Sequence, residues 1–311
     1  FTVRCAMVLQ TIHNSNLPND EETNEDDIPR KKNNVDIPLI MKSGIKEEIT
    51  KQVVRKKLAK QRHLVIQKAI HPEYLDSLFP TLLSNFQPQN VHYNGGIAQV
   101  KEWKISCYLE VMPGGIPCTN PNLYLLEIFR PLLDTCNELF VHWYRQQHAC
   151  NHRCNQGNDG TSSTISKTGT YTVTRLMTFV TRYTPNPGEQ ALLKHVDGAG
   201  KVDGSIVVAL PMDYGLSSTT TDNASTSTSN SSSSSSSSAA EESPWLGGFE
   251  GGGLTVWDGR DSKSRQPLEL HYDTRSGDVA FLDRAVWHQA DPITRGIRWA
   301  LVIFYQVTTT S

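Results

Sequence analysis

Three residues in the C-terminal half of the chain, His195, Asp197 and His288, have the types and the spacing of a metal site. Two imidazoles and one carboxylate can hold a divalent metal on one triangular face and leave the opposite face open to substrate and oxygen. This arrangement is expected of non-haem Fe(II) oxygenases. His195 and Asp197 are two residues apart, which places both side chains on the same side of a strand. We expect His288 to complete the site from a strand near the C-terminus.

An arginine at a regular distance strengthens this hypothesis, because a trio of two histidines and one carboxylate often arises by chance. Arg298 lies ten residues after His288, within the sequence Gly296-Ile-Arg-Trp299. A second histidine-x-aspartate sequence, His271 and Asp273, lies 15 residues before His288. The pair and His288 would lie on neighbouring segments, and no histidine after His288 could complete a triad with the pair from across a barrel. We therefore interpret His271 and Asp273 as surface or rim residues.

Another cluster of possible ligands alternates along the sequence at His148, Cys150, His152 and Cys154. Zinc motifs usually place a tight turn between paired ligands, whereas this alternation would put all four side chains on one side of a strand. We therefore favour no structural metal there. Six cysteines in a chain of 311 residues do not make a disulfide scaffold, so reduced thiols in an intracellular protein are the expected state.

The overall composition excludes little but points away from two classes of partner. The chain has 30 Lys and Arg against 32 Asp and Glu, so net charge gives no argument for nucleic acid or a membrane. No stretch approaches the roughly 18 consecutive apolar residues of a membrane helix. The chain begins at Phe1 without an initiator Met, as expected of a fragment that has lost its N-terminus.

The first half of the chain is expected to be helical after a polar tail. Residues 1–43 are polar and aperiodic, which predicts disorder. Residues 45–63 predict a basic helix with Ile45, Ile49, Val53 and Leu58 near one face, and we interpret its many cations as a solvated surface. Apolar periodicity then predicts helices from Pro72 to Phe86 and from Leu123 to Tyr144, the second kinked or broken at Pro131, and strands at 64–66 and 103–112.

The second half is expected to be made of strands. The predicted strands are rich in β-branched and aromatic residues and are bounded by Gly, Pro or Asp; they cover 170–183, 205–210, 253–257, 279–282 and 299–307. Helices followed by strands, without βαβ alternation, indicate an α+β protein whose C-terminal half is a sandwich or barrel. Short strands with variable connections favour a jelly roll.

A low-complexity insertion at 215–243, with eight consecutive serines from Ser231 to Ser238, interrupts the strands. Nothing in it can bury apolar area, so we expect a mobile surface loop between two strand ends. The segments on either side of it then belong to one domain, which we place at 64–311.

The order of motifs resembles the 2-oxoglutarate and Fe(II)-dependent dioxygenase superfamily, and within it the prolyl 4-hydroxylase-type catalytic domain. The motifs that carry the resemblance are Tyr183, His195-Val-Asp197, Gly251-Gly-Gly-Leu-Thr255, Ser276-Gly-Asp-Val-Ala-Phe281, His288, Pro292 and Gly296-Ile-Arg298-Trp299. The resemblance implies a double-stranded β-helix, a jelly roll with flanking N-terminal helices.

The resemblance also implies roles for five residues. His195, Asp197 and His288 match the metal ligands, and Arg298 matches the cation that binds the distal carboxylate of 2-oxoglutarate. A guanidinium suits that task because it can grip a carboxylate with two hydrogen bonds. The ten-residue spacing and the following tryptophan favour Arg298 over the nearby Arg295. Tyr183 matches a tyrosine that contacts the cosubstrate, although an ordinary half-buried strand tyrosine is an equal alternative.

One position departs from the pattern, because Leu192 stands where many relatives have an aromatic residue; this leaves the cosubstrate contacts of that strand open. The implied reaction converts 2-oxoglutarate and O2 to succinate and CO2 and hydroxylates a substrate, with ascorbate as reductant. A peptidyl residue of the prolyl type is the substrate that the resemblance suggests. The alternatives are a jelly-roll binding module that has lost turnover and, with less support, nucleic-acid demethylation.

Overall fold

We describe a computed structural model of the chain. It describes residues 39–89, 92–94, 97–99, 103–111, 120–148, 170–185, 194–211, 249–261 and 263–310. Most of the predicted tail, the insertion at 215–243, Leu192 and the cluster residues Cys150, His152 and Cys154 lie outside the described residues. No helix in the described part of the chain is long and apolar enough to cross a membrane.

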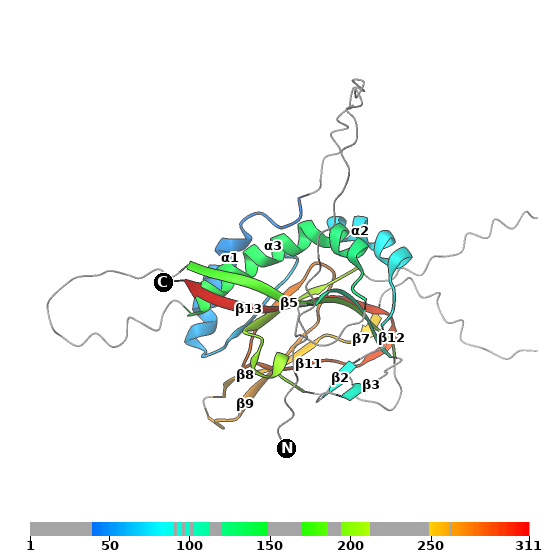
Figure 1. The fold of residues 1–311 in the computed structure, drawn as a ribbon. Coiled ribbons are helices and arrows are strands. Elements are labelled where there is room, and N and C mark those ends of the chain that lie inside the picture. The colour runs from blue at the N-terminus through cyan, green and yellow to red at the C-terminus, as the bar shows by residue number, and fades with distance from the viewer. Residues whose placement is uncertain are drawn as a thin grey trace, which may run out of the picture. The chain divides into compact units, whose positions relative to one another are not determined.

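Three helices form one layer, as the apolar periodicity predicts (Figure 1). They are α1 (Ile45–Leu58), α2 (Pro72–Asn85) and α3 (Leu123–His148). Helix α3 continues through Pro131, so this residue does not break it. Helix α1, which we expected to be separate from the domain at 64–311, buries Ile45, Ile49 and Val53 in the same core as α3 and the sheet.

Leu58 does not join the buried residues of α1, because it is 83% exposed. The prediction that it lies near the face of Ile45, Ile49 and Val53 is wrong. An α-helix turns by about 100° per residue, so Leu58 lies about 180° around the helix from the centre of that face. The helical period therefore places Leu58 on the solvent side, like Val54, which is 55% exposed.

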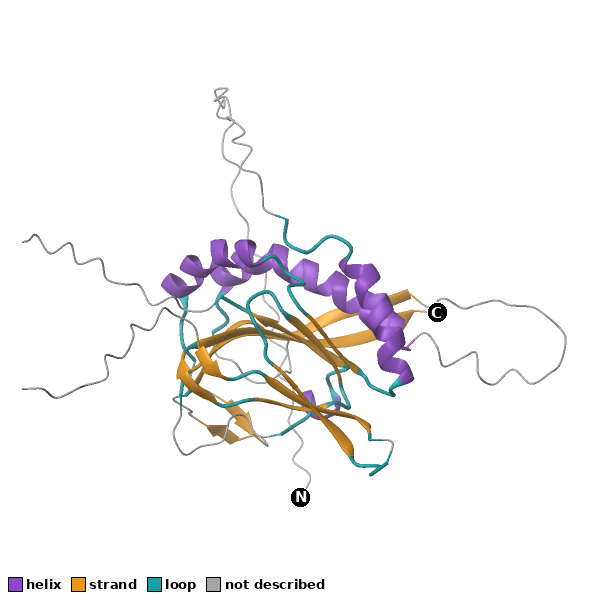
Figure 2. Cartoon of the chain, turned by 180° about the vertical axis from the view of Figure 1, so that it is seen from behind, coloured by secondary structure: helices purple, strands orange, loops and turns teal. Residues whose placement is uncertain are grey.

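Six antiparallel strands form the major sheet beneath the helices (Figures 1 and 2). In spatial order these are β1 (His63–Ile66), β10 (Val279–Asp283), β6 (Gly204–Ala209), β13 (Arg298–Thr310), β5 (Thr170–Tyr183) and β4 (Lys104–Val111). The sequence predicts all six, because most of their residues are buried and β-branched or aromatic.

A smaller sheet lies against the other face of the major sheet. It contains β11 (Trp287–Ala290), β8 (Leu254–Arg260) and β9 (Pro267–Tyr272). Leu254 and Val256 of β8 pack against Ala280 and Leu282 of β10, which places the two sheets face to face. Two further strand pairs join β12 (Ile293–Gly296) to β7 (Phe249–Gly251) and β2 (His92–Asn94) to β3 (Ile97–Gln99). The fold is therefore a double-stranded β-helix, a jelly roll with flanking N-terminal helices, as predicted.

The layer of helices is attached to the major sheet through aromatic side chains. The ring of Phe140 on α3 stacks on that of Tyr305 on β13, with 4.1 Å between the ring centroids. Neither residue is exposed to solvent. Trp143 and Tyr144 of α3 also contact rings of the sheet, those of Phe281 and Tyr171. Loss of the Phe140 ring would leave a cavity between the two layers.

We expect Phe140→Ala to lower the free energy of unfolding by about 3–5 kcal/mol, because it removes a buried ring and leaves a cavity. Urea denaturation measures this change. Leu58→Ala is the matched control, because Leu58 is exposed, and we expect a change within about 0.5 kcal/mol. A loss below about 1 kcal/mol in Phe140→Ala would contradict the packing described above.

Candidate metal centre

Two backbone hydrogen bonds bring His195 and His288 together. The amide of each residue donates to the carbonyl of the other over 2.9 Å, which makes an isolated antiparallel bridge at the edge of β11. Directly paired residues point to the same side of a sheet. The two imidazoles therefore lie side by side, with 4.4 Å between their ring centroids.

Asp197 reaches the site from a turn and not from the strand that the spacing predicts. Val196 is extended, and Asp197 then begins a short 3-10 helix, η1 (Asp197–Gly200). Gly198 has a φ of 64°, and a Cβ at this position would lie 2.0 Å from a methyl carbon of Val202. The turn thus requires a glycine directly after the carboxylate, and it points Asp197 back toward the histidines.

The three side chains present their ligand atoms to one another. Asp197 Oδ1 lies 3.7 Å from Nε2 of His195 and 3.6 Å from Nε2 of His288. One ligand atom from each residue lies within 4.8 Å of the other two, so one divalent ion could contact all three. The structure therefore brings together the three residues that the sequence indicates as metal ligands.

Neighbouring groups orient two of these ligands. The Oγ of Ser205 donates to Asp197 Oδ2 over 2.5 Å, which leaves Oδ1 facing the histidines. The Nδ1 of His288 lies 3.1 Å from the carbonyl oxygen of Val286. Because a carbonyl only accepts, Nδ1 carries the proton and Nε2 keeps its lone pair for a metal.

The electrostatics also favour the protonation states that a metal needs. Burial opposes ionisation of Asp197, but the charge of His288 and the interactions with His195 and Ser205 outweigh it and lower its pKa to about 2. Burial is the main reason that the pKa of His288 is lowered. An ionised carboxylate and a neutral imidazole are the forms that bind a divalent cation.

Arg298 lies in the interior at the start of β13 and is only 3% exposed. Its Nη2 donates to Thr274 Oγ1 over 3.2 Å, and its guanidinium carbon lies 5.5 Å from the ring centroid of Tyr183. Among the described residues, no group accepts a hydrogen bond from its buried Nε and Nη1. By contrast, Arg295 lies on β12 and is exposed. Nη1 of Arg298 lies beside Nη2, which has a second N–H, so a carboxylate could bind this end of the guanidinium with two hydrogen bonds.

A row of side chains connects Arg298 to the edge of the major sheet. Lys104 of β4 pairs with Tyr183 of β5, and Tyr183 pairs with Arg298 of β13. The three side chains therefore point to the same face. Sequence reasoning missed Lys104, as it missed Thr274 and Ser205. No local pattern marks these residues, because the register between distant strands creates their positions.

The competing pair lies away from the three ligands, as we expected of surface or rim residues. His271 and Asp273 have side chains that are 52% and 70% exposed. The imidazole of His271 lies 3.0 Å from Asp273 and 2.9 Å from Asp291. Its two nitrogens are thus occupied by carboxylates on the outer face of the smaller sheet.

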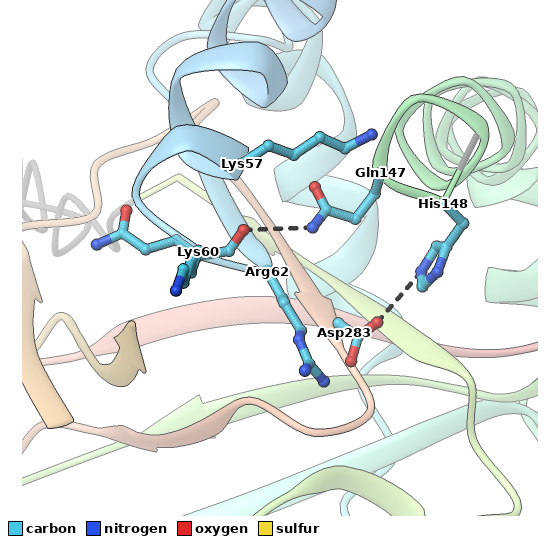
Figure 3. Close-up of a pocket in the computed structure, with 7 residues that line it drawn as sticks. Lys57, Lys60, Arg62, Gln147, His148 and Asp283 are labelled. Atoms are coloured by element: carbon cyan, nitrogen blue, oxygen red, sulfur yellow. Dashed lines mark hydrogen bonds and ion pairs between the residues drawn. The ribbon is translucent and has the colours of Figure 1, made fainter. Parts of the chain in front are cut away.

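His148 lies in a pocket between the ends of α1 and α3 (Figure 3). It is the last residue of α3, so it does not lie on the strand that the alternating pattern suggested. Its Nε2 is 3.2 Å from Asp283 Oδ2, and Gln147 donates to the carbonyl oxygen of Gln61 over 3.2 Å. The lining residues of this pocket thus share an ion pair and a hydrogen bond, and they include none of the three metal ligands.

Comparison with known proteins gives similarity of fold at low identity. Neither a protein-family model nor a curated protein matches the sequence. A 2OG-Fe(II) oxygenase family oxidoreductase from Burkholderia pseudomallei is 14% identical over 83% of this chain and 89% of its own, with a TM-score of 0.47. A prolyl-4-hydroxylase from Pseudomonas putida is 13% identical over 83% of this chain and 99% of its own, with a TM-score of 0.45.

A third solved structure is a prolyl hydroxylase from Trichoplax adhaerens in complex with a peptide fragment of a hypoxia inducible factor. It is 13% identical over 84% of this chain and 90% of its own, with a TM-score of 0.46. Because these identities and TM-scores are low, any argument about function rests on the residues of this chain.

We expect His288→Ala to weaken the binding of Mn(II), as a stand-in for Fe(II), by at least about 100-fold, because it removes one of the three ligands that the described residues offer. Calorimetric titration of the protein measures this affinity. His271→Ala is the matched control and should bind Mn(II) as the wild type does. Equal losses in the two variants would show that the metal binds elsewhere.

Proposed function

We propose that this protein is an Fe(II) and 2-oxoglutarate-dependent dioxygenase that hydroxylates a substrate. The observation that carries the proposal is the combination of two unlike binding groups in one interior. Three candidate metal ligands, His195, Asp197 and His288, lie within reach of one ion, and the guanidinium of Arg298 is a buried cation with two donors that no described group accepts.

The ligand set fits Fe(II). Two imidazole nitrogens and one carboxylate oxygen would hold the ion on one face and leave the remaining positions open. Structural zinc sites instead use four protein ligands, usually including thiolates, and leave no coordination position open. With Fe(II) and 2-oxoglutarate bound, the site would supply oxidation by O2, with succinate and CO2 as coproducts and the substrate hydroxylated. Ascorbate is the proposed reductant that keeps the iron in the ferrous state.

The arginine fits the distal carboxylate of 2-oxoglutarate. Thr274 accepts a hydrogen bond from Nη2 of Arg298, which fixes the plane of the guanidinium and leaves its other donors directed into the interior. The ring of Tyr183 packs beside the guanidinium, and Ala290, Ile293 and Ala300 surround the ring with apolar side chains. In such surroundings the charge pair is stronger than in water, and competing water is excluded.

The chain contributes geometry and protonation states to the reaction. Ser205 and Val286 hold Asp197 and His288 in the orientations that present one lone pair each. Arg298 would set the distance of the cosubstrate from the metal ligands and so orient the reacting groups. A peptidyl residue of the prolyl type remains the proposed substrate, on the basis of the motif resemblance alone. A complete ligand set with a matching arginine disfavours the alternative of an inactive binding module.

We expect the purified protein to form succinate from 2-oxoglutarate when it is given Fe(II), ascorbate and a crude extract as a source of substrate. Asp197→Ala is the control, because it removes the carboxylate ligand. The rate should fall by at least about 100-fold in this variant. Wild-type protein that forms no more succinate than Asp197→Ala would refute the hydroxylase and favour the binding module.

We also expect Arg298→Ala to weaken the binding of 2-oxoglutarate by about 30-fold or more, since loss of a bidentate charge-assisted contact costs about 2–3 kcal/mol. Titration of the metal-loaded protein with 2-oxoglutarate measures the change. Arg295→Ala removes the same charge from an exposed site three residues away, and it should have little effect. The opposite order would refute the assignment of Arg298.

A further inference from the structure

Strand β6 carries one hydroxyl among apolar residues, and this hydroxyl faces a candidate metal ligand. Ser205 is the second residue of the strand, whose sequence is Gly-Ser-Ile-Val-Val-Ala, and it is fully buried. It pairs with Leu282 of β10 and with Phe304 of β13, and directly paired residues point to the same side of a sheet. A hydroxyl in such apolar surroundings costs free energy unless it is hydrogen-bonded. Ser205 is therefore tolerated there because of its partner, Asp197.

The hydrogen bond from Ser205 gives the two oxygens of Asp197 different tasks. Ser205 Oγ donates to Oδ2 over 2.5 Å, which is the length of a hydrogen bond between a hydroxyl and an ionised carboxylate. Oδ1 lies 3.7 Å from Nε2 of His195 and 3.6 Å from Nε2 of His288, so it is the oxygen that faces the candidate metal position. The hydroxyl thus occupies one oxygen and leaves the other for a metal.

The backbone holds both ends of this hydrogen bond in place. Strand β6 is paired on both sides, with β10 and with β13, within the major sheet. Asp197 begins η1, where the amide of Lys201 donates to the carbonyl of Gly198 over 2.9 Å. Val202 fills the space beside this turn, because a Cβ on Gly198 would lie 2.0 Å from one of its methyl carbons. Rotation of the carboxylate itself is therefore the easiest movement left to Asp197.

The number of oxygens that Asp197 offers matters because a carboxylate can bind a metal ion with one oxygen or with both. Two imidazoles and one carboxylate oxygen leave several positions on the metal open. A 2-oxo acid needs two of them, because it binds through its 2-oxo oxygen and an oxygen of the neighbouring carboxylate. An Asp197 that also bound through Oδ2 would compete for one of these positions.

We propose that Ser205 is a positioning residue that keeps Asp197 a one-oxygen ligand, and so keeps open a metal position that 2-oxoglutarate and O2 require. This inference rests on the proposed dioxygenase function and concerns how its site stays open. Without the hydroxyl, Oδ2 would lose a hydrogen-bond donor, and a buried acceptor without a partner is costly. The carboxylate would then turn so that both of its oxygens bind the metal.

The first experiment counts the water molecules on bound Mn(II), a stand-in for Fe(II), before 2-oxoglutarate is added. Broadening of the electron paramagnetic resonance lines in water enriched in oxygen-17 gives this number. We expect one water molecule fewer in Ser205→Ala than in wild type, and the wild-type number in Ser205→Thr, which keeps the hydroxyl. A hydroxyl with a structural role alone would change the stability of the fold but not this number. Equal numbers in Ser205→Ala and wild type would overturn the proposal.

Thr178→Val is the matched control for the loss of a buried hydroxyl. Thr178 Oγ1 donates to Glu110 Oε2 over 3.4 Å, so it also has a carboxylate as its partner. It pairs with Ile303, whose side chain lies in the core beneath the helices, and it therefore points away from the metal ligands. Thr178→Val should keep the wild-type number of water molecules, and a loss of one water molecule in this variant too would contradict the assignment to Ser205.

The second experiment separates metal binding from cosubstrate binding by calorimetric titration. The affinity for Mn(II) should differ by no more than about 3-fold between wild type and Ser205→Ala, because a second carboxylate oxygen compensates for the lost orientation. Such binding also shows that the variant is folded. The affinity of the Mn(II)-loaded protein for 2-oxoglutarate should fall at least about 10-fold in Ser205→Ala, which corresponds to about 1.4 kcal/mol. Weaker Mn(II) binding with unchanged 2-oxoglutarate binding would overturn the proposal.

Crystals of the wild type with Mn(II) test the proposal without a variant. Oδ2 of Asp197 should stay within hydrogen-bond distance of Ser205 Oγ and should not contact the metal. Binding of Mn(II) by both oxygens of Asp197 would overturn the proposal. Failure of the wild type to bind Mn(II) would instead refute the metal centre, and failure of the Mn(II)-loaded wild type to bind 2-oxoglutarate would refute the dioxygenase itself.

Discussion

The reciprocal backbone bridge between His195 and His288 is the interaction on which the rest of the site depends. The two histidines are far apart in the sequence, and two amide-carbonyl hydrogen bonds between them fix their separation. A shift of one residue in this pairing would turn one imidazole to the outer face of the smaller sheet, because successive residues of a strand point to opposite faces. The pairing of β11 with β8 holds this register.

The second constraint is that the polar groups of the interior must be satisfied or directed at a ligand. Ser205 and Val286 satisfy the parts of Asp197 and His288 that do not face the candidate metal position. Arg298 has one described partner, Thr274, and two further donors without one among the described residues. Because an unpaired buried donor is costly, this guanidinium is the strongest indication that an anion belongs in the interior. The row from Lys104 through Tyr183 to Arg298 gives that interior its positive charge.

The sequence predicts the layers of the fold but not all of their members. The long helices and the buried strands are found because apolar residues recur with a clear period, as in α3 and β5. Strands β7, β9 and β12 were missed, because they are short and carry exposed residues such as Glu250 and Thr294. Leu58 was placed on the wrong face, because a turn of about 100° per residue puts it opposite Ile45, Ile49 and Val53.

The candidate ligands could be predicted because binding of a divalent metal requires particular residue types, here two imidazoles and a carboxylate. The predicted strand for Asp197 was wrong, because a separation of two residues from His195 fits the start of η1 as well as a strand. Lys104, Thr274 and Ser205 could not be found, since only the pairing of strands distant in the sequence brings them to the site.

The most direct test of the proposed site is an anomalous diffraction measurement on crystals grown with Mn(II) and 2-oxoglutarate in the absence of oxygen. We expect one strong anomalous peak bounded by His195, Asp197 and His288, with the distal carboxylate of 2-oxoglutarate on Arg298. A peak at another group, such as His271 and Asp273, or a cosubstrate that does not contact Arg298, would contradict these assignments.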